Sequence, residues 1–433
     1  MIPFEKDELD GSRDLAVIAH PNLDSLGENA LEYRLEEAVG LALAIGLKTT
    51  SARNFSVRAP KAGTLFGSGQ VDQIKTILAQ EGANILVVDG SLSAIQQRNL
   101  EEFLNVKVID RTGLILEIFG ARATTAEGRL QVELAHLDYQ AGRLVRSWTH
   151  LERQRGGFGF LGGPGETQIE SDRRMIRDRM AKLRRDLSHL QKTRSLHRSR
   201  RQKAPWPVVA LVGYTNAGKS TLFNRLTGAD VMAEDLLFAT LDPTMREFPL
   251  PGYDKAIISD TVGFVSDLPT QLVAAFRATL EEVTAADIIV HVRDISHAAS
   301  DAQSHDVKQI LADLGVELVE VDGAGPLLIE AWNKVDLIDG DDPESPQLPD
   351  HVPENVVLIS AIKGEGLDKL VDMISSNLSR NHDIAKISVP AGDGKRIAWL
   401  HENGKILQTD QQANALIMDV KMSKRNWGRY NAL

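Results

Sequence analysis

Apolar and polar positions follow two alternating patterns over the first 124 residues. Short apolar runs predict buried strands, and they cover Leu15–Ile18, Asn84–Val88 and Val106–Ile109. Apolar residues at helical spacing predict helices over Ala30–Ile45, Val71–Leu78 and Leu92–Leu104. Such alternation is typical of a parallel sheet with helices packed on it. We therefore expect an N-terminal parallel α/β domain over residues 1–124, with a disordered acidic start.

A different pattern, with apolar residues four and three positions apart, follows over Ala126–Gln154. It predicts a helix about 43 Å long with a narrow apolar seam, formed by Leu130, Leu134, Leu137, Ala141, Leu144, Trp148 and Leu151. A second seam comprises Ile176, Met180, Leu183, Leu187 and Leu190. Two seamed helices joined by one short segment predict a long antiparallel helical hairpin over residues 125–204.

The segment that joins the two helices, residues 156–165, has six glycines in ten positions. A loop that only reverses the chain rarely needs this much glycine. Its apolar side chains, Phe158, Phe160 and Leu161, can insert between bases or apolar walls. We interpret the loop as a probe, and the plainer alternative is a flexible tip.

A third domain is expected over residues 205–380, and it begins with a phosphate-binding pattern. The apolar run Val208–Val212 leads into the glycine-rich segment Gly213–Thr221, and helical spacing follows. Such a turn leaves several backbone N–H groups in one concavity, where phosphate oxygens fit. Lys219 can then reach the outer phosphates, and the Ser220 hydroxyl can bind Mg²⁺. We interpret the segment as a P-loop rather than an ordinary glycine turn.

A carboxylate motif follows the next apolar strand. Asp260 comes directly after the strand pattern around Ile257 and Ile258, with Gly263 three positions later. Asp260 can hold Mg²⁺ through water, and the Gly263 N–H can meet a γ-phosphate.

Two further motifs, again at strand ends, indicate the base. Asn333–Asp336 closes the run Leu327–Trp332, and Asp336 can accept two hydrogen bonds from guanine. Adenine lacks that donor pair and would leave the carboxylate unpaired. Ser360–Ala361 ends another apolar run and can place a backbone N–H on the guanine oxygen. Together, the phosphate-binding and base-reading motifs predict that the protein binds GTP.

The segment Leu236–Thr244 lies between the P-loop and Asp260, where a switch should offer a hydroxyl to Mg²⁺. Thr240 is the preferred ligand, with Thr244 as the alternative. Many GTPases place a water-orienting glutamine where this chain has Phe264, so unassisted hydrolysis should be slow. Asn216 stands where some related GTPases hold a potassium ion, which predicts stimulation by K⁺.

The motifs give one expected set of site residues. Catalytic roles are expected for Lys219, Thr240, Gly263 and Asn216, and Mg²⁺ binding for Ser220 and Thr240. Nucleotide contacts are expected from Gly213, Tyr214, Thr215, Asn216, Ala217, Gly218, Lys219, Ser220, Thr221, Phe238, Ala239, Thr240, Leu241, Asp242, Asp260, Thr261, Val262, Gly263, Asn333, Lys334, Val335, Asp336, Ser360 and Ala361.

The last stretch predicts a small α+β domain over residues 381–433, built around the apolar runs Ala385–Pro390 and Ala415–Val420. Its end interleaves basic residues with Trp427 and Tyr430. A contact surface and simple packing are equally good interpretations of that end.

Charge and composition narrow the possible partners and compartments. The chain carries a net charge of −11, yet residues 171–203 carry +10, so the remainder carries −21. A bias of this size predicts contact between the second hairpin helix and phosphates, against the alternative of a solvated face. The chain has no cysteine, no apolar run long enough for a membrane span and no signal-peptide pattern. We expect a cytoplasmic protein without disulfides.

Nearly the whole chain resembles the HflX family of translation-associated GTPases. The resemblance rests on Gly67–Val71, on Gly162–Glu170 and on Phe238–Thr244. It implies the same four-part order, with a Ras-like GTPase domain as the third part. It also implies binding to the large ribosomal subunit, with the glycine loop directed toward the peptidyl-transferase region, and rescue or splitting of stalled ribosomes. It allows ATP use through the N-terminal domain, although Gly67–Gly69 is more simply a helix start.

We therefore expect a monomeric GTP hydrolase whose nucleotide state controls docking on the ribosome. One alternative is a non-enzymatic assembly scaffold that uses bound GTP as a latch. Another is an ATP-dependent RNA remodeller that acts through its N-terminal domain.

Overall fold

A computed structural model of the chain describes residues 14–23, 28–154, 173–190, 206–229, 237–238, 244–253, 255–266, 283–316, 326–338, 348–349, 351–380, 382–412, 415–423, 427 and 430. The acidic start and the glycine-rich loop 156–165 lie outside these residues. The chain forms two compact units, of which the first comprises Met1–Leu187, Asp235–Phe238 and Leu268–Ala275. The division into four domains stays a prediction.

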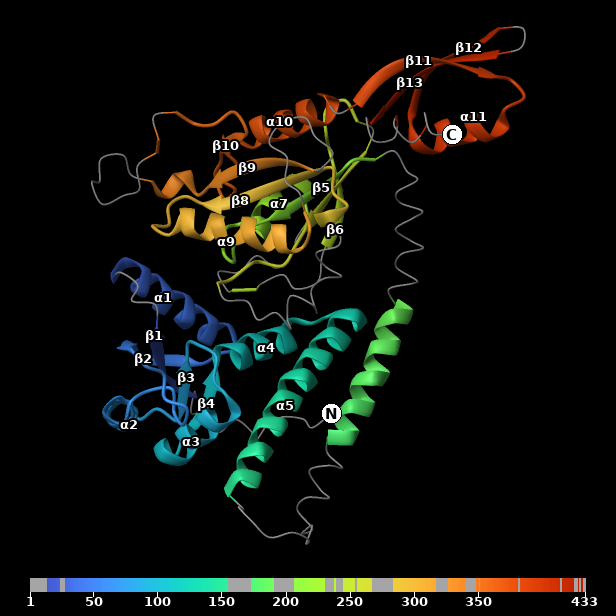
Figure 1. The fold of residues 1–433 in the computed structure, drawn as a ribbon. Coiled ribbons are helices and arrows are strands. Elements are labelled where there is room, and N and C mark those ends of the chain that lie inside the picture. The colour runs from blue at the N-terminus through green and yellow to red at the C-terminus, as the bar shows by residue number, and fades with distance from the viewer. Residues whose placement is uncertain are drawn as a thin grey trace. The chain divides into compact units, whose positions relative to one another are not determined.

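The first unit contains a four-stranded sheet in which all neighbouring strands are parallel, as predicted (Figure 1). Its strand order is β2-β1-β3-β4, with β1 at Leu15–Asn22, β2 at Lys48–Ser56, β3 at Ile85–Val88 and β4 at Lys107–Asp110. Four helices pack on it: α1 (Glu28–Ala44), α2 (Ser68–Glu81), α3 (Ala94–Leu104) and α4 (Arg111–Arg122). The core between the sheet and helices α2 and α3 includes Val17, Leu86, Ile74 and Leu100. The parallel α/β prediction is confirmed.

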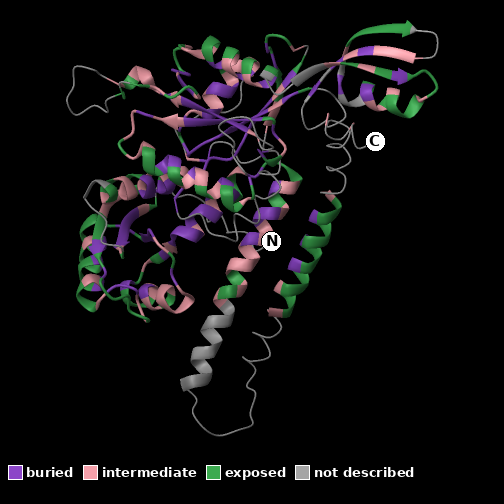
Figure 2. Ribbon diagram, turned by 45° about the horizontal axis from the view of Figure 1, so that its top comes forward, coloured by how far each residue is buried: buried purple, intermediate pink, exposed green. Residues whose placement is uncertain are grey.

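The hairpin consists of α5 (Ala126–Gln154) and a helix over residues 173–190, of which all but the last turn belongs to the same unit. On the second helix, the predicted seam is correct, because Met180, Leu183 and Leu187 are buried while most other residues are exposed (Figure 2). An ion pair of 2.6 Å between Arg179 and Glu133 of α5 joins the two helices.

The seam predicted for α5 differs from the buried face that the structure shows. Val132 and Ala135 are buried, whereas the seam residues Leu134 and Leu137 are only half-buried. The reason is that α5 also packs against α3 and α4, so a second side of this helix faces the domain core.

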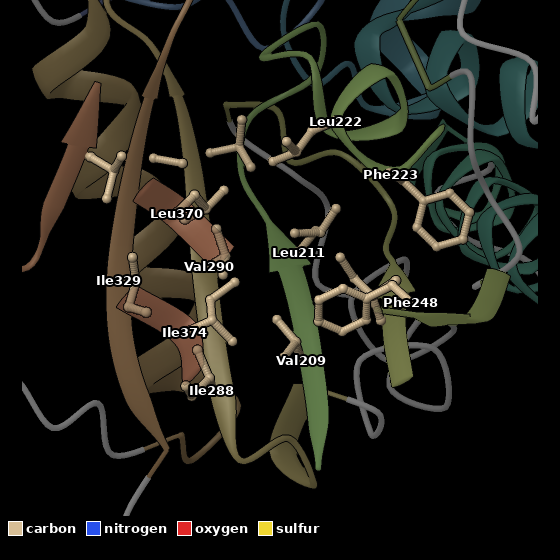
Figure 3. Packing of buried hydrophobic residues seen from close by; sticks show 14 of the residues in the cluster. Val209, Leu211, Leu222, Phe223, Phe248, Ile288, Val290, Ile329, Leu370 and Ile374 are labelled. Carbon is tan, nitrogen blue, oxygen red and sulfur yellow. The ribbon is translucent and has the colours of Figure 1, made fainter. Parts of the chain in front are cut away.

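The second unit contains a six-stranded sheet of order β10-β9-β8-β5-β7-β6. The strands are β5 (Val208–Val212), β6 (Thr244–Phe248), β7 (Ala256–Asp260), β8 (Ile288–Asp294), β9 (Leu327–Asn333) and β10 (Val356–Leu358). Only the β6–β7 pair of this sheet is antiparallel. Helices α7 (Lys219–Thr227), α9 (Ser300–Asp313) and α10 (Leu367–Arg380) accompany it. Valine, leucine and isoleucine side chains of β5, β8 and β9 form one core with Leu222 of α7 and Leu370 and Ile374 of α10 (Figure 3).

A three-stranded antiparallel sheet follows, of order β11-β13-β12, with one helix. Its elements are β11 (His382–Pro390), α11 (Gly394–Asn403), β12 (Lys405–Gln412) and β13 (Ala415–Ser423), which confirms the small α+β prediction. Trp427 and Tyr430 pack against its core, and the Tyr430 ring centroid lies 5.7 Å from that of Trp399. Packing is therefore the role that the structure supports for this aromatic pair.

Candidate functional site

The predicted P-loop connects the central strand β5 to α7. Because the neighbouring strands β7, β8 and β9 are parallel to β5 or to each other, their carboxyl ends bring the other motifs to the same edge. Gly218 is the N-cap of α7, has a φ of 93° and makes no side-chain cap hydrogen bond. A Cβ at this position would overlap Nδ2 of Asn333, so only glycine fits. The helix start therefore presents its backbone N–H groups to an anion.

Lys219 is almost completely buried at this helix start. The residue is 6% exposed, and its Nζ donates a hydrogen bond of 2.7 Å to the carbonyl oxygen of Tyr214. Burial lowers the pKa of Lys219 to about 8, although the charge of Asp260 acts in the opposite direction. An ammonium group with so little hydration is stabilised by phosphate charge, which fits its predicted role.

Two oxygen groups meet where Mg²⁺ is expected. Asp260, fully buried at the end of β7, accepts a hydrogen bond of 2.7 Å from the Ser220 hydroxyl. Hydroxyl and carboxylate oxygens are hard donors that suit Mg²⁺, so this pair fits the ion. No cluster of three or more histidine, aspartate or glutamate ligands occurs within the part of the chain that the structure describes. Additional ligands would come from phosphate and water, as in other nucleotide sites.

Gly263 lies directly against the P-loop. A Cβ added to it would be 2.8 Å from Cγ2 of Thr215 and 3.1 Å from Nζ of Lys219. The Thr215 hydroxyl is buried and has no hydrogen-bond partner among the described residues, which suits an oxygen that a phosphate or a cation would satisfy. Phe264 is only 2% exposed, so the side chain at the place of the usual glutamine is turned into the interior.

The base-reading motif is held by a network around Asn333. Its amide Nδ2 donates to the Ala217 carbonyl at 2.8 Å, and its Oδ1 accepts from the Ala361 N–H at 2.9 Å. One side chain thus ties the P-loop to the Ser360–Ala361 loop. The Ala361 N–H already donates to Asn333, so the expected contact between a backbone N–H of Ser360–Ala361 and a guanine oxygen stays a prediction. Asp336 is half-buried in the short 3₁₀ helix η1 (Val335–Leu337).

Two residues that the sequence reasoning did not single out hold these loops. Asp294, at the end of β8, pairs with Nζ of Lys334 at 2.7 Å and accepts from the Ser296 N–H and hydroxyl. Arg225 of α7 donates to the Ile362 carbonyl at 2.5 Å. Asp294 could have been found, because it follows an apolar strand just as Asp260 does. Arg225 carries no comparable signal, since its partner is a backbone atom far along the chain.

The structure describes only some of the remaining residues that were predicted to contact the nucleotide. Thr261 is buried and donates to the Leu211 carbonyl at 2.7 Å, and Asn216 has the positive φ of 59°. Phe238 belongs to the first unit, where its ring packs edge-on against Phe119 with centroids 4.6 Å apart. Four predicted residues lie outside the described ones, namely Ala239, Thr240, Leu241 and Asp242. The role of Thr240 as a Mg²⁺ ligand therefore stays a prediction.

Gly67–Gly69 in the first unit is organised as a helix start. The Gly67 N–H donates to Oε1 of Gln70 at 3.0 Å, and the Gln70 amide donates to the Ser56 carbonyl at 2.8 Å. These contacts support the simpler interpretation of the segment.

Four family models match successive segments of the chain. Residues 32–120 match the model described as GTP-binding GTPase N-terminal, and residues 122–201 match GTP-binding GTPase middle region. Residues 208–321 match 50S ribosome-binding GTPase, and residues 350–430 match HflX C-terminal domain.

Curated relatives match over most of their own length. A protein described as GTPase HflX from Magnetococcus marinus is 43% identical over 416 residues, which cover 96% of this chain and 94% of that protein. A GTPase HflX from Escherichia coli is 40% identical over 86% of this chain and 88% of that protein. A crystal structure of a GTP-binding protein from Sulfolobus solfataricus in complex with GDP aligns with a TM-score of 0.43 at 24% identity, over 84% of this chain and 99% of that one.

Proposed function

The chain belongs to the HflX family of GTPases, and we propose that its nucleotide state controls its docking on the large ribosomal subunit in ribosome rescue or splitting. Hydrolysis of GTP to GDP and phosphate follows from the family and from the matched GTPase segment. The ribosomal partner is suggested by the model that matches residues 208–321. No helix among the described residues is long and apolar enough to cross a membrane.

The proposed pocket lies at the carboxyl ends of the parallel strands of the six-stranded sheet. The backbone from Gly213 to Thr221 and the buried Lys219 hold the phosphates, and Asp336 reads guanine. A Cβ at Gly263 would lie only 3.1 Å from Nζ of Lys219, so this backbone passes close to the phosphate-binding lysine, and the Gly263 N–H is proposed as the sensor of the γ-phosphate. Because Phe264 is buried and apolar, no side chain at that position orients the attacking water. Slow hydrolysis without the ribosome is the expected consequence.

Metal ions complete this proposal. Ser220 and Asp260 offer oxygens for Mg²⁺, which supplies positive charge against the phosphates when bound. Thr240 is proposed as the hydroxyl of the switch. Asn216 is proposed to hold K⁺, and its left-handed backbone conformation is compatible with a tight loop around the phosphates.

The observation that carries the ribosome proposal is an arginine stripe on the helix over residues 173–190, formed by Arg173, Arg174, Arg177, Arg184 and Arg185. At 100° per residue these five positions fall in a sector of about 120°, which contains neither Asp178 nor Asp186. Four of the five are exposed and Arg173 is half-buried. Guanidinium groups are well suited to pair with the phosphates of structured RNA. The glycine-rich loop is proposed to act as the probe beyond this anchoring face.

Sedimentation with separated ribosomal subunits and a non-hydrolysable GTP analogue tests the proposal. Replacing Arg173, Arg177, Arg184 and Arg185 by Ala should weaken binding to the large subunit. If each lost contact removes about 0.7–0.9 from the slope of log affinity against log salt, the slope should fall by roughly 3. Intrinsic GTP hydrolysis should stay unchanged, since the stripe does not belong to the nucleotide pocket.

A control with the same loss of charge replaces four exposed basic residues of the first unit, Arg53, Lys61, Lys75 and Arg98. Equal weakening by both variants would show that only net charge matters. Binding of the stripe variant at the wild-type level across the salt series would reduce the stripe to a solvated face. Shortening residues 156–165 should leave most of the affinity but abolish any effect on the ribosome's active centre.

A further inference from the structure

The hydroxyl of Tyr214 contacts the backbone of the segment that follows Gly263. Tyr214 is the second residue of the loop and is only 4% exposed. Its hydroxyl oxygen accepts a hydrogen bond from the Ser266 N–H at 2.5 Å. Ser266 lies three residues beyond Gly263, and it is itself only 3% exposed.

This contact continues a short backbone pairing between the two segments. The Thr215 N–H donates to the Phe264 carbonyl at 2.7 Å, and the Phe264 N–H donates to the Gly213 carbonyl at 3.1 Å. Tyr214 and Phe264 are partners in a parallel bridge. Gly213–Thr215 therefore holds the segment Gly263–Ser266 at two points. Two main-chain bonds hold it at Phe264, and the Tyr214 hydroxyl holds it at Ser266.

The result of this arrangement is that the Gly263 backbone is fixed close to the phosphate-binding groups. A Cβ at Gly263 would stand 2.9 Å from Cα of Thr215 and 3.1 Å from Nζ of Lys219. With Phe264 turned into the interior, the alignment of the γ-phosphate end depends on backbone groups. The alignment of the Gly263 N–H therefore depends on the contacts that fix the backbone of Gly263–Ser266.

We propose that Tyr214 is a positioning residue for GTP hydrolysis, whose hydroxyl fixes the Gly263–Ser266 backbone against the P-loop. This inference rests on the proposed role of Gly263, and it does not depend on ribosome binding. The tyrosine does not act on the reacting atoms. It acts through the Ser266 N–H, which donates to the tyrosine hydroxyl.

The Tyr214→Phe variant tests the inference, because it removes the hydroxyl and keeps the buried ring. Full-length protein is loaded with GTP, and single-turnover hydrolysis is measured without ribosomes, together with GDP affinity. The hydrogen bond is worth about 1–2 kcal/mol, so hydrolysis should slow by roughly 5- to 30-fold where that energy serves to align the backbone in the transition state. GDP affinity should change by less than about twofold, since GDP has no γ-phosphate for this segment to meet.

The matched control is Tyr253→Phe. Tyr253 is a half-buried tyrosine that packs on the same core, in the turn between β6 and β7 at the opposite edge of the sheet. Its hydroxyl should be dispensable for hydrolysis. An equal slowing in both variants would indicate a general loss of stability and would overturn the proposal.

Hydrogen exchange of the Ser266 amide gives a second measurement, which reports directly whether the Tyr214 hydroxyl holds this backbone segment. In the wild-type protein this amide should be protected, and in Tyr214→Phe it should exchange faster while the β5 amides do not. Hydrolysis at the wild-type rate, or GDP affinity that falls in step with the rate, contradicts the proposal. A Gly263→Ala variant that hydrolyses GTP normally would instead remove the role of Gly263 on which the inference rests.

Discussion

Nucleotide affinity should fall as pH rises above 8, because of Lys219. Its pKa in the nucleotide-free protein is about 8, lowered by burial from the ordinary value of 10.5. Phosphate oxygens beside Nζ favour the ammonium form, so the pKa of Lys219 must rise when nucleotide binds. Binding above pH 8 therefore takes up a proton, and the affinity falls with increasing pH.

The size of the effect follows from the fraction of Lys219 that is already protonated. With a pKa near 8, this fraction is roughly 0.9 at pH 7.0 and roughly 0.14 at pH 8.8. If the pKa in the complex lies well above this range, affinity should fall about sevenfold, or about 1 kcal/mol. The nucleotide-free protein should show the opposite trend in stability. Between pH 8 and 10.5 the unfolded chain binds more protons at this lysine, so stability rises with pH over that window.

Equilibrium binding of GDP at pH 7.0 and 8.8 measures the change, at a pH where the guanine N1–H is still largely intact. Calorimetry in two buffers of different ionisation enthalpy reports proton uptake directly. Lys219→Arg is the matched variant, because a guanidinium stays charged throughout, and its GDP affinity should lose the pH dependence. A wild-type affinity that is flat across this range, with no proton uptake, would refute the reasoning.

Three further predictions concern the same pocket. Asp336→Asn should exchange the preference for guanine for one for xanthine, whose 2-oxo group accepts from the new amide; unchanged GTP preference in competition with the xanthine nucleotide would remove Asp336 from base reading. K⁺ should stimulate turnover over Na⁺, and Asn216→Ala should abolish this stimulation; equal rates in the two salts would leave Asn216 as a turn residue. Gly263→Ala places a Cβ 2.8 Å from Cγ2 of Thr215, so single-turnover hydrolysis should slow about tenfold or more while GDP still binds, and a wild-type rate would contradict the proposed packing.

Motifs at strand ends made the placement of the candidate site residues predictable from the sequence. The run Val208–Val212 is β5 with the same bounds, and Asp260 and Asn333 stand at the ends of β7 and β9. A parallel sheet collects the carboxyl ends of its strands at one edge, so a few short motifs suffice to assemble the site. The order of the strands in the sheet is not needed to predict that these motifs lie together.

Polar edge strands, and contacts between residues distant in sequence, were harder to predict. Strand β2, Lys48–Ser56, has no apolar run, because an edge strand is half exposed and needs few apolar side chains. Strand β8 was missed although Ile288–Val292 is apolar except for His291. The Tyr214 hydroxyl contact escapes any pattern, since the P-loop motif specifies backbone shape at that position and leaves the side chain unexplained.

The first unit has its own possible nucleotide crevice, and the way it is filled bears on the ATP prediction. In the order β2-β1-β3-β4, the connection from β1 leads to β2 on one side of β1, and the connection from β2 crosses back to β3 on the other side. Ligands bind at such a switch point, here between β1 and β3. There His20 of β1 pairs with Asp89 at 2.8 Å, and Asp89 pairs with Arg111, which also pairs with Glu37.

All four side chains of this network are buried. Burial opposes their charges, but Arg111 and His20 hold the pKa of Asp89 below its ordinary value. A phosphate at this crevice would have to take Arg111 from two carboxylates, and leaving those charges buried without their partner costs about 3–5 kcal/mol. The start of α7, in contrast, has no side-chain cap to displace. The physical bias is therefore for nucleotide at the P-loop, and ATP use at the first sheet requires a rearrangement of this ion-pair network.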